Sequence, residues 1–306
     1  MSVVVVGSAN LDLVYTVERI PRPGETVLAT GAASYPGGKG NNQVVAVARS
    51  GAEVAFVAAM GTDDASGTLL AVLADAGVRA HVRRVDAPTG TALITVDASA
   101  ENVIVVNPGA NAALVELTAE EREVVAAADV LLLQLEIPLG TVLEAARTAR
   151  EAGTLVVLNA APIQPLPQDL LDLVDLLVVN EHEARELAGE RGAAGSVDAL
   201  SEAVRPLAPA AVVTLGGEGA LVVAGGATRR LSGHAVDAVD TTGAGDTFCG
   251  ALVAALDRRG SERLGLESLV AAAEWAGAAA AIAVTRPGAV PAIPTADEVE
   301  DFLARR

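Results

Sequence analysis

The chain has little of several things that would place it in a specialised class of protein. Of its 306 residues only one is a cysteine, Cys249, so an intrachain disulfide is excluded. Aromatic residues make up 2% of the sequence, and no uninterrupted apolar run reaches the roughly 18–20 residues that span a bilayer. The N-terminus lacks the basic flank of a signal peptide. These absences predict a cytoplasmic protein with a closely packed aliphatic core.

Basic residues are scarce as well. The 21 Lys and Arg residues are outnumbered by 39 Asp and Glu residues, which gives a net charge of −18. Because nucleic acids and anionic membranes bind basic faces, neither is an expected partner. The three histidines, His81, His182 and His234, show no metal-ligand spacing. An anionic ligand can still be held by local backbone N–H groups and bound cations.

What the sequence does contain is a stretch of small residues, Gly243-Ala244-Gly245, followed by Asp246 and a helical pattern of apolar residues over 248–256. The three small residues therefore lie where a helix begins, and the unpaired N–H groups there attract an anion. Asp246 beside an anion site has two interpretations. It is either the base that deprotonates a hydroxyl attacking a phosphoryl group, or an acidic first-turn residue that favours the helix dipole.

Along the chain, apolar strand-like runs alternate with amphipathic helical patterns. This alternation is typical of an α/β protein with a parallel sheet covered on both faces. Two runs, 91–97 and 102–106, have too little helix between them for a parallel crossover, so they are predicted to form an antiparallel hairpin. Together with segment 15–33, the hairpin is expected to form a small sheet outside the main one.

Polar residues follow the predicted strands, at the carboxyl ends where ligands of parallel sheets gather. Any one group alone is explained as ordinary polar residues of a loop, but five groups at one edge of a sheet favour an active site. They are Asn10 with Asp12, Gln134 with Glu136, Asn159, Asn180 with Glu183, and Thr214 to Gly219.

Several of these groups have a second interpretation. Asn10 and Asp12 project to one side of an extended segment and suit vicinal hydroxyls, but they are also ordinary loop residues. The run 36–43, Pro-Gly-Gly-Lys-Gly-Asn-Asn-Gln, lacks Walker spacing and is either a ligand-binding turn or a flexible helix cap. Asn180 and Glu183 suit Mg²⁺, or form a relative of the capping box.

These pieces resemble the PfkB carbohydrate-kinase family over essentially the whole chain. The Gly-Ala-Gly-Asp motif at 243–246 marks the wider family. Two segments that are specific to fewer members, Gly-Gly-Lys-Gly at 37–40 and Gly-Ala-Asn-Ala-Ala-Leu at 109–114, point to its ribokinase branch. The matching motifs, in family order, are Gly7 to Asp12, Pro23 to Thr26, Gly37 to Gln43, Gly109 to Leu114, Gln134 to Glu136, Asn180 with Glu183, Thr214 to Gly216, Asp240 to Phe248, and Ala281 to Arg286.

The resemblance implies a single domain over residues 1–306 with a three-layer α/β/α ribokinase-like fold. Its central sheet would be mostly parallel, and a small antiparallel β lid would be formed by about 13–33 and 91–106. In this family the lid sheets of two subunits pack together, so the resemblance also implies a homodimer.

The implied activity is ATP-dependent phosphorylation of the 5-hydroxyl of D-ribose to D-ribose 5-phosphate. Asp246 would be the base, with Gly243, Ala244 and Gly245 as the anion hole. The implied sugar contacts are Asn10, Asp12, Gly38, Lys39, Asn42, Glu136 and Asp246. The implied nucleotide contacts are Asn180, Thr214, Leu215, Gly216, Gly217, Glu218, Gly219, Gly245 and Gly277.

The resemblance also implies two cations. Mg²⁺ would accompany ATP and be organised through water by Asn180 and Glu183. An activating K⁺ would lie among Asp240, Thr242, Ala283, Arg286, Gly288 and Ala292, mainly on backbone oxygens. Two residues depart from the family pattern. Ala292 lacks the hydroxyl of a Ser that is frequent there, and Gly277 replaces a larger polar residue that often flanks the adenine.

Two other functions remain open. Another sugar or nucleoside kinase of the family would act on deoxyribose, fructose or adenosine, but Asn10 and Asp12 suit a small polyhydroxylated furanose better than a nucleoside. A non-catalytic sugar-binding protein would have no need of Asp246 or the glycines before it, and all of them are present.

Overall fold

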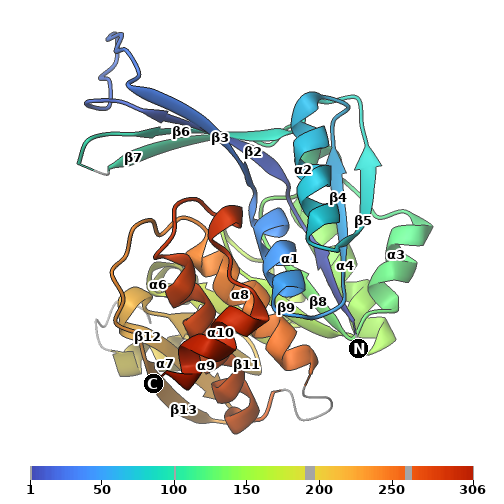
Figure 1. Ribbon diagram of the computed structural model, residues 1–306. Helices are drawn as coiled ribbons and strands as arrows, with labels where there is room; N and C mark the ends of the chain where they lie inside the picture. The colour runs from blue at the N-terminus through green and yellow to red at the C-terminus, as the bar shows by residue number, and fades with distance from the viewer. Residues whose placement is uncertain (1, 100, 190–196, 259–263, 306) are drawn as a thin grey trace.

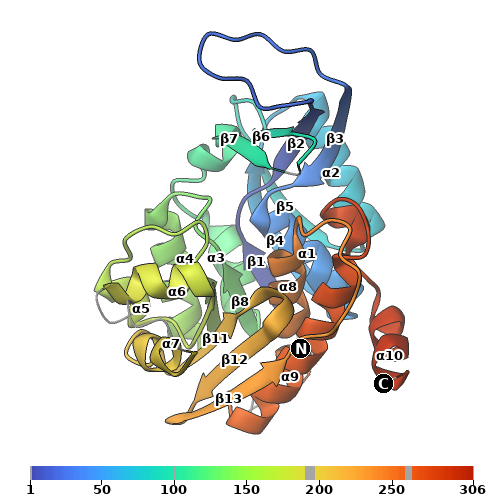
Figure 2. The ribbon, with the colours of Figure 1, turned by 90° about the vertical axis from the view of Figure 1, so that its left-hand side faces the viewer.

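The computed structural model describes residues 2–99, 101–189, 197–258 and 264–305, and its main body is a large sheet with helices on both faces (Figures 1 and 2). Its nine described strands lie in the order β13-β12-β11-β10-β9-β8-β1-β4-β5. Neighbours from β11 to β5 pair in parallel, and β12 and β13 add an antiparallel edge. The strands are β1 (Val3–Val6), β4 (Val54–Met60), β5 (Arg79–Arg84), β8 (Val130–Leu133), β9 (Leu155–Asn159), β10 (Leu176–Asn180), β11 (Ala210–Thr214), β12 (Gly219–Ala224) and β13 (Ala227–Ser232).

Strand β1 shows how the sequence builds a core on both sides of the sheet. Val3 and Val5 pack into one hydrophobic cluster, and Val4 and Val6 into the other. The first cluster is covered by α1 (Lys39–Arg49), α2 (Asp64–Asp75), α8 (Ala244–Asp257), α9 (Leu266–Ala283) and α10 (Ala296–Ala304). The second is covered by α3 (Ala119–Ala126), α4 (Leu139–Ala152), α5 (Gln168–Leu171), α6 (Glu181–Ala188) and α7 (Val197–Val204). This is the predicted three-layer α/β/α arrangement.

A second sheet projects from the main body (Figure 1). Its order is β3 (Gly31–Gly37), β2 (Asn10–Thr16), β6 (Gly90–Val96), β7 (Asn102–Asn107). The outer pairs are antiparallel, as predicted, whereas β2 and β6 run parallel in the centre. A parallel pair needs a long crossover, and the chain between β2 and β6 passes through β4, α2 and β5 of the main body.

The sheets differ from the sequence patterns mainly at their edges. Strands β5 and β13 were not predicted, because Arg-rich segments such as Arg79–Arg84 lack the apolar pattern of a buried strand. Strand β12 was not predicted either, and only its first residue, Gly219, lies in the polar group predicted after β11. In the second sheet, residues 17–30 form no strand, and the sheet reaches back to Asn10 and on to Gly37.

Helix α9 is, by length and composition alone, apolar enough to cross a membrane, with a mean hydropathy of 1.3. It carries Glu267 and Glu274, so it is not an uninterrupted apolar run. More than half of it, 56%, is buried, and it packs against α8, α10 and β12. A core helix of a soluble fold passes the same test of length and composition. The described residues also form the short 3₁₀ turns η1 (Gly109–Ala113), η3 (Gly216–Glu218) and η5 (Val290–Ala292).

Candidate active site

Helix α8 begins at Ala244, directly after Gly243, where the sequence predicts a helix end. Gly243 caps the helix at a φ of 72°, and a Cβ there would lie 2.7 Å from the Cβ of Ala289, so only glycine fits. The Ala244 N–H donates to the Thr241 carbonyl over 3.2 Å. The N–H groups of Gly245 and Asp246 have no acceptor within the helix and can therefore meet an anion.

Asp246 is held from α1 by two side-chain amides. Asn42 Nδ2 donates to its Oδ2 and Gln43 Nε2 to its Oδ1, each over 2.9 Å. The carboxylate is only 8% exposed. Helices α1 and α8 approach this closely because Gly250 has no side chain, since a Cβ there would lie 2.5 Å from the Ala46 Cβ. The carboxylate is thus fixed in direction while carrying no ion pair to an arginine.

Two cavities meet at Gly245, the residue before Asp246. The larger, about 830 Å³, is lined by Gly216, Gly217 and Gly277 and reaches the beginning of α8 at Ala244 and Gly245. The smaller, about 140 Å³, is lined by Lys39, Asn180, Glu183, Gly245 and Asp246 among others. Thr214 and Gly245 line both. Among the predicted nucleotide contacts, Gly219 also lines the larger cavity, whereas Leu215 and Glu218 do not, and Glu218 pairs instead with Arg230 at 2.7 Å.

The predicted sugar contacts on β2 are placed by glycines on the neighbouring strands. Asn10 is 3% exposed, and its Oδ1 accepts from Asn111 Nδ2 over 2.7 Å. A Cβ on Gly90 would lie 2.2 Å from that same Oδ1. Likewise, a Cβ on Gly37 would lie 2.1 Å from a carboxylate oxygen of Asp12. Both glycines therefore leave the room that these polar side chains occupy.

The carboxylates near Asp246 crowd one another. Burial, and then the charges of Glu136 and Asp246, raise the pKa of Asp12 to about 7. Glu136 Oε2 accepts from Ser8 Oγ over 2.6 Å and from the Lys39 backbone N–H over 3.0 Å. The charge of Asp246, with those of Glu136 and Glu183, raises the pKa of Lys39 against the opposing effect of burial. The site is therefore rich in negative charge, with the Lys39 ammonium close to Asp246.

Asn42 offers an unused acceptor. Its Nδ2 is committed to Asp246, and its buried Oδ1 has no hydrogen-bond partner among the described residues. Because a buried acceptor without a donor is costly, a ligand hydroxyl that donates to Oδ1 would remove this cost.

Asn180 and Glu183 form a full capping box at the beginning of α6. Asn180 Oδ1 accepts from the Glu183 N–H, and Glu183 Oε2 accepts from the Asn180 N–H, each over 2.8 Å. Both residues also line the smaller cavity, and burial raises the pKa of Glu183. A carboxylate with one oxygen uncommitted and an adjacent amide fit a hydrated Mg²⁺. No cluster of three or more acidic, His or Cys side chains fit for a metal occurs in the described parts of the chain.

Two residues of the predicted K⁺ loop, Thr242 and Gly288, contact Asp240. Burial alone would raise the pKa of Asp240, but hydrogen bonds from Thr242 and from Gly288, 2.9 and 2.8 Å long, hold it below its usual value. The Arg286 guanidinium turns to Glu298, and Ala292 is 1% exposed. One carboxylate and a turn of backbone carbonyls fit a weakly hydrated monovalent cation.

Several residues that shape this site were placed near it by the sequence, but without any role toward Asp246 or Asn10. Gln43, Gln134 and Asn159 link to Asp246 through hydrogen bonds, and Asn111 holds Asn10. Their positions at strand ends and in the quoted motifs were the available signal. Their amide partners lie far away in sequence and could not be read from it. Cys249 is buried in α8, and burial raises the pKa of its thiol well above the usual value.

Comparison with known proteins agrees with this geometry. The family model described as pfkB family carbohydrate kinase matches residues 1–296, and the chain belongs to this family of kinases. Its relatives include the ribokinase of Haemophilus influenzae, 41% identical over 98% of this chain and 97% of the relative, and that of Bacillus subtilis, 37% identical over 99% of each. The solved structure of Arabidopsis thaliana ribokinase complexed with ribose and ATP has a TM-score of 0.89, with 31% identity over 98% of both chains.

Proposed function

We propose that this protein transfers the γ-phosphate of ATP to the 5-hydroxyl of D-ribose, giving D-ribose 5-phosphate and ADP. The observation that carries the proposal is the buried Asp246, held by two amides at an anion-binding helix end where two cavities meet. The curated relatives named ribokinase, at up to 41% identity, support ribose as the sugar.

The sugar is held by polar groups from β2, α1 and the segment after β8. Asn10, Asp12 and Glu136 supply oxygens for its hydroxyls, and Asn42 Oδ1 supplies the unused acceptor. Gly38, with a φ of 85°, lies against β2, since a Cβ there would lie 2.7 Å from the Asn10 N atom. A small polyhydroxylated ring satisfies this many acceptors better than an apolar base would.

ATP occupies the larger cavity with its phosphates directed to the N–H groups at the beginning of α8. As the sugar oxygen bonds to the γ-phosphorus and the bond to ADP breaks, Asp246 accepts the hydroxyl proton. Lys39 and the helix end stabilise charge on the transferring group. Asn180 and Glu183 would hold Mg²⁺ through water, and the ion would supply positive charge to the phosphates.

A K⁺ ion at Asp240 and the carbonyls of the 283–292 segment would act on the anion site through packing. Ala289 of this segment lies against Gly243, which caps α8. Ala292 offers no hydroxyl, so backbone oxygens carry this site, and we expect activation by K⁺ at higher concentrations than a serine at 292 would require.

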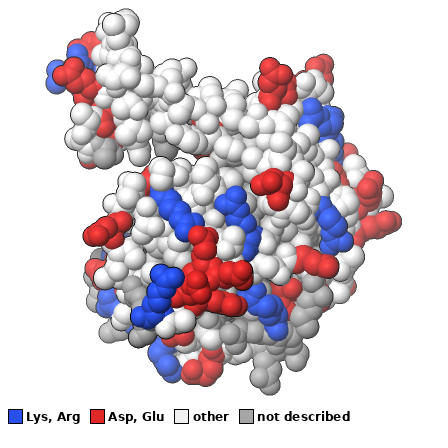
Figure 3. All heavy atoms as spheres, in the orientation of Figure 1, with Lys and Arg blue, Asp and Glu red and all other residues white. Residues whose placement is uncertain are grey.

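The projecting sheet acts as the lid and as a dimer interface in the cytoplasm. All four valine and isoleucine residues of β7 are exposed, from 48% for Val103 to 61% for Val105, and Figure 3 shows few charges on the sheet outside its tip. A second copy of the chain would cover this apolar strand.

The test is ATP-dependent phosphorylation of ribose, 2-deoxyribose, fructose and adenosine, with and without K⁺. We expect the highest kcat/KM on ribose and stimulation by K⁺. Preference for another of these substrates would assign the protein to a different kinase of the same family. Sugar binding without turnover on any of them would assign it to the non-catalytic alternative.

A further inference from the structure

A row of buried amides leads from Asp246 into the protein. Gln43 Nε2 donates to Asp246 Oδ1 over 2.9 Å and to Asn159 Oδ1 over 3.0 Å. Gln43 Oε1 accepts from Gln134 Nε2 over 2.7 Å. Gln43 and Gln134 are fully buried, and neither lines either cavity at the site. The Gln43 amide therefore has a partner for both N–H bonds and for its oxygen.

Two acceptors, the Val178 carbonyl and the Asp246 carboxylate, determine which end of each side-chain amide donates. The Val178 carbonyl can only accept, so Asn159 Nδ2 donates to it over 3.2 Å and Asn159 Oδ1 faces Gln43. The carboxylate of Asp246 also accepts, so Gln43 must present its NH₂ group to both. Gln43 Oε1 then needs a donor, which Gln134 supplies. Gly7 leaves room for that amide, because a Cβ there would lie 2.0 Å from Gln134 Oε1.

We propose that Gln134 is a positioning residue for phosphoryl transfer, acting through Gln43 on Asp246. A Gln43 amide turned by 180° keeps its shape but places its oxygen against the carboxylate, and it places its NH₂ against the NH₂ of Gln134. The donor on Gln134 adds to the acceptors of Asp246 and Asn159 in disfavouring this turned state, and so helps to keep the Asp246 carboxylate aimed at the sugar hydroxyl. The inference rests on the proposed role of Asp246 as the base.

The experiment compares Gln134→Met with Gln134→Glu. Methionine has a similar length and no donor, so Gln43 Oε1 loses its partner and the turned state of Gln43 is opposed only by Asp246 and Asn159. We expect kcat to fall about tenfold with a sugar KM changed less than about twofold. In Gln134→Glu the ionised carboxylate cannot donate, but the protonated acid can. The ratio of its kcat to wild type should therefore rise as the pH is lowered from about 8 to about 6, while the ratio for Gln134→Met stays constant.

A matched control is available at the same strand end. Gln164 Nε2 donates to the Leu135 carbonyl over 3.2 Å, and no hydrogen bond links it to Asp246. Gln164→Met and Gln164→Glu are expected to keep kcat at every pH. Gln43→Met removes the amide that contacts Asp246 and should lower kcat at least as much as Gln134→Met. Thermal unfolding of each variant shows that the loss is measured on folded protein.

All rates are measured on the sugar that the wild type phosphorylates best. The sugar preference of the wild type then tests the proposed function. The ratio of the variant kcat to the wild-type kcat tests the role of the amide row, so one of these proposals can fail without the other. Equal ratios for Gln134→Met and Gln134→Glu at every pH would overturn the inference. A raised sugar KM with unchanged kcat in both variants would overturn it as well.

Discussion

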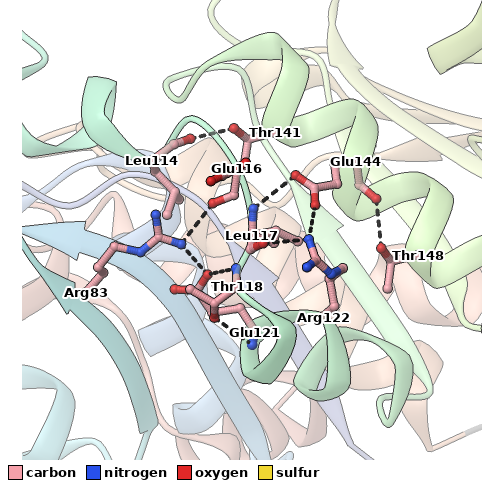
Figure 4. Close-up of polar contacts among 10 residues, drawn as sticks. All are labelled: Arg83, Leu114, Glu116, Leu117, Thr118, Glu121, Arg122, Thr141, Glu144 and Thr148. Atoms are coloured by element: carbon pink, nitrogen blue, oxygen red, sulfur yellow. Dashed lines mark hydrogen bonds and ion pairs between the residues drawn. The ribbon is translucent and has the colours of Figure 1, made fainter.

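Glu121 and Asp246 are both buried carboxylates, 6% and 8% exposed, and their surroundings are opposite. Glu121 accepts from the Arg83 guanidinium and, over 2.7 Å, from the Thr118 N–H (Figure 4). Next to it Arg122 donates to Glu144 over 2.6 Å, so this Arg–Glu network, made of Arg83, Glu121, Arg122 and Glu144, has a cation for each carboxylate. Asp246 is bonded by two neutral amides instead, and the Lys39 ammonium close to it also interacts with Glu136 and Glu183.

The charges around the two carboxylates have opposite consequences. In the Arg–Glu network they are balanced, and Glu144 and Arg122 also bond to the backbone of Leu117. The network therefore stabilises the segment between η1 and α3. Around Asp246, burial raises the pKa of Asp12, and repulsion from the carboxylates of Glu136 and Asp246 raises it further. A site short of positive charge and of donors is less stable alone, and its ligands supply what is missing.

The largest expected effect is on catalysis at Asp246. We expect Asp246→Asn to lower kcat by at least about 10², since a general base is lost. The melting temperature should change little, because the removal of one of three crowded charges is offset by the loss of an acceptor for one of the two amides that bond Asp246. The control is Glu121→Gln, which should lower the melting temperature and keep kcat. Steady-state rates with both substrates saturating give kcat, and thermal unfolding gives the melting temperature. Near-normal turnover by Asp246→Asn would contradict the assignment of Asp246 as the base.

The next effect is a pH-dependent stability cost at Asp12. Its pKa of about 7 exceeds the unfolded value of 3.8, so the folded protein binds more protons between these values and loses stability as the pH rises through them. Asp12→Asn removes this loss. The difference in free energy of unfolding between Asp12→Asn and wild type should grow in favour of the variant by about 2–3 kcal/mol as the pH rises from about 5 to about 7, and stay constant above pH 7. Urea unfolding from about pH 5 to 8 measures this, and parallel curves would contradict it.

A smaller effect is expected in the Arg–Glu network. Arg83→Met leaves the buried Glu121 with only its Thr118 partners, and should cost about 1–3 kcal/mol of stability. Because none of these residues lines a cavity at the site, kcat should not change. Urea unfolding and the kinase assay, run on one preparation, separate the two. A fall in kcat with intact stability would contradict the division between the regions.

The smallest effect belongs to an exposed pair. Arg147 and Asp169 lie 2.8 Å apart, and both side chains are more than half exposed. Water screens such a pair, so Arg147→Ala should change the free energy of unfolding by less than about 0.5 kcal/mol. A loss as large as that of Arg83→Met would show that burial does not decide the value of these ion pairs.

The sequence predicted those parts of the molecule that local pattern determines. The alternating α/β order, the hairpin of β6 and β7, and the beginning of α8 at Gly243 follow from periodicity and glycine placement. The parallel pairing of β2 with β6 does not, because it depends on the path of the chain through the main body. The bonds of Gln43 and Gln134 to distant partners were hidden for the same reason.

The most direct test of the account is the identity of the product formed by the wild-type protein from ATP and D-ribose. Phosphorus-31 and carbon-13 NMR of the reaction mixture show which sugar carbon bears the phosphate. The account predicts one sugar phosphate, with the phosphorus coupled to C5, formed in step with ADP. Phosphate on another carbon, or ADP released without any sugar phosphate, would contradict it.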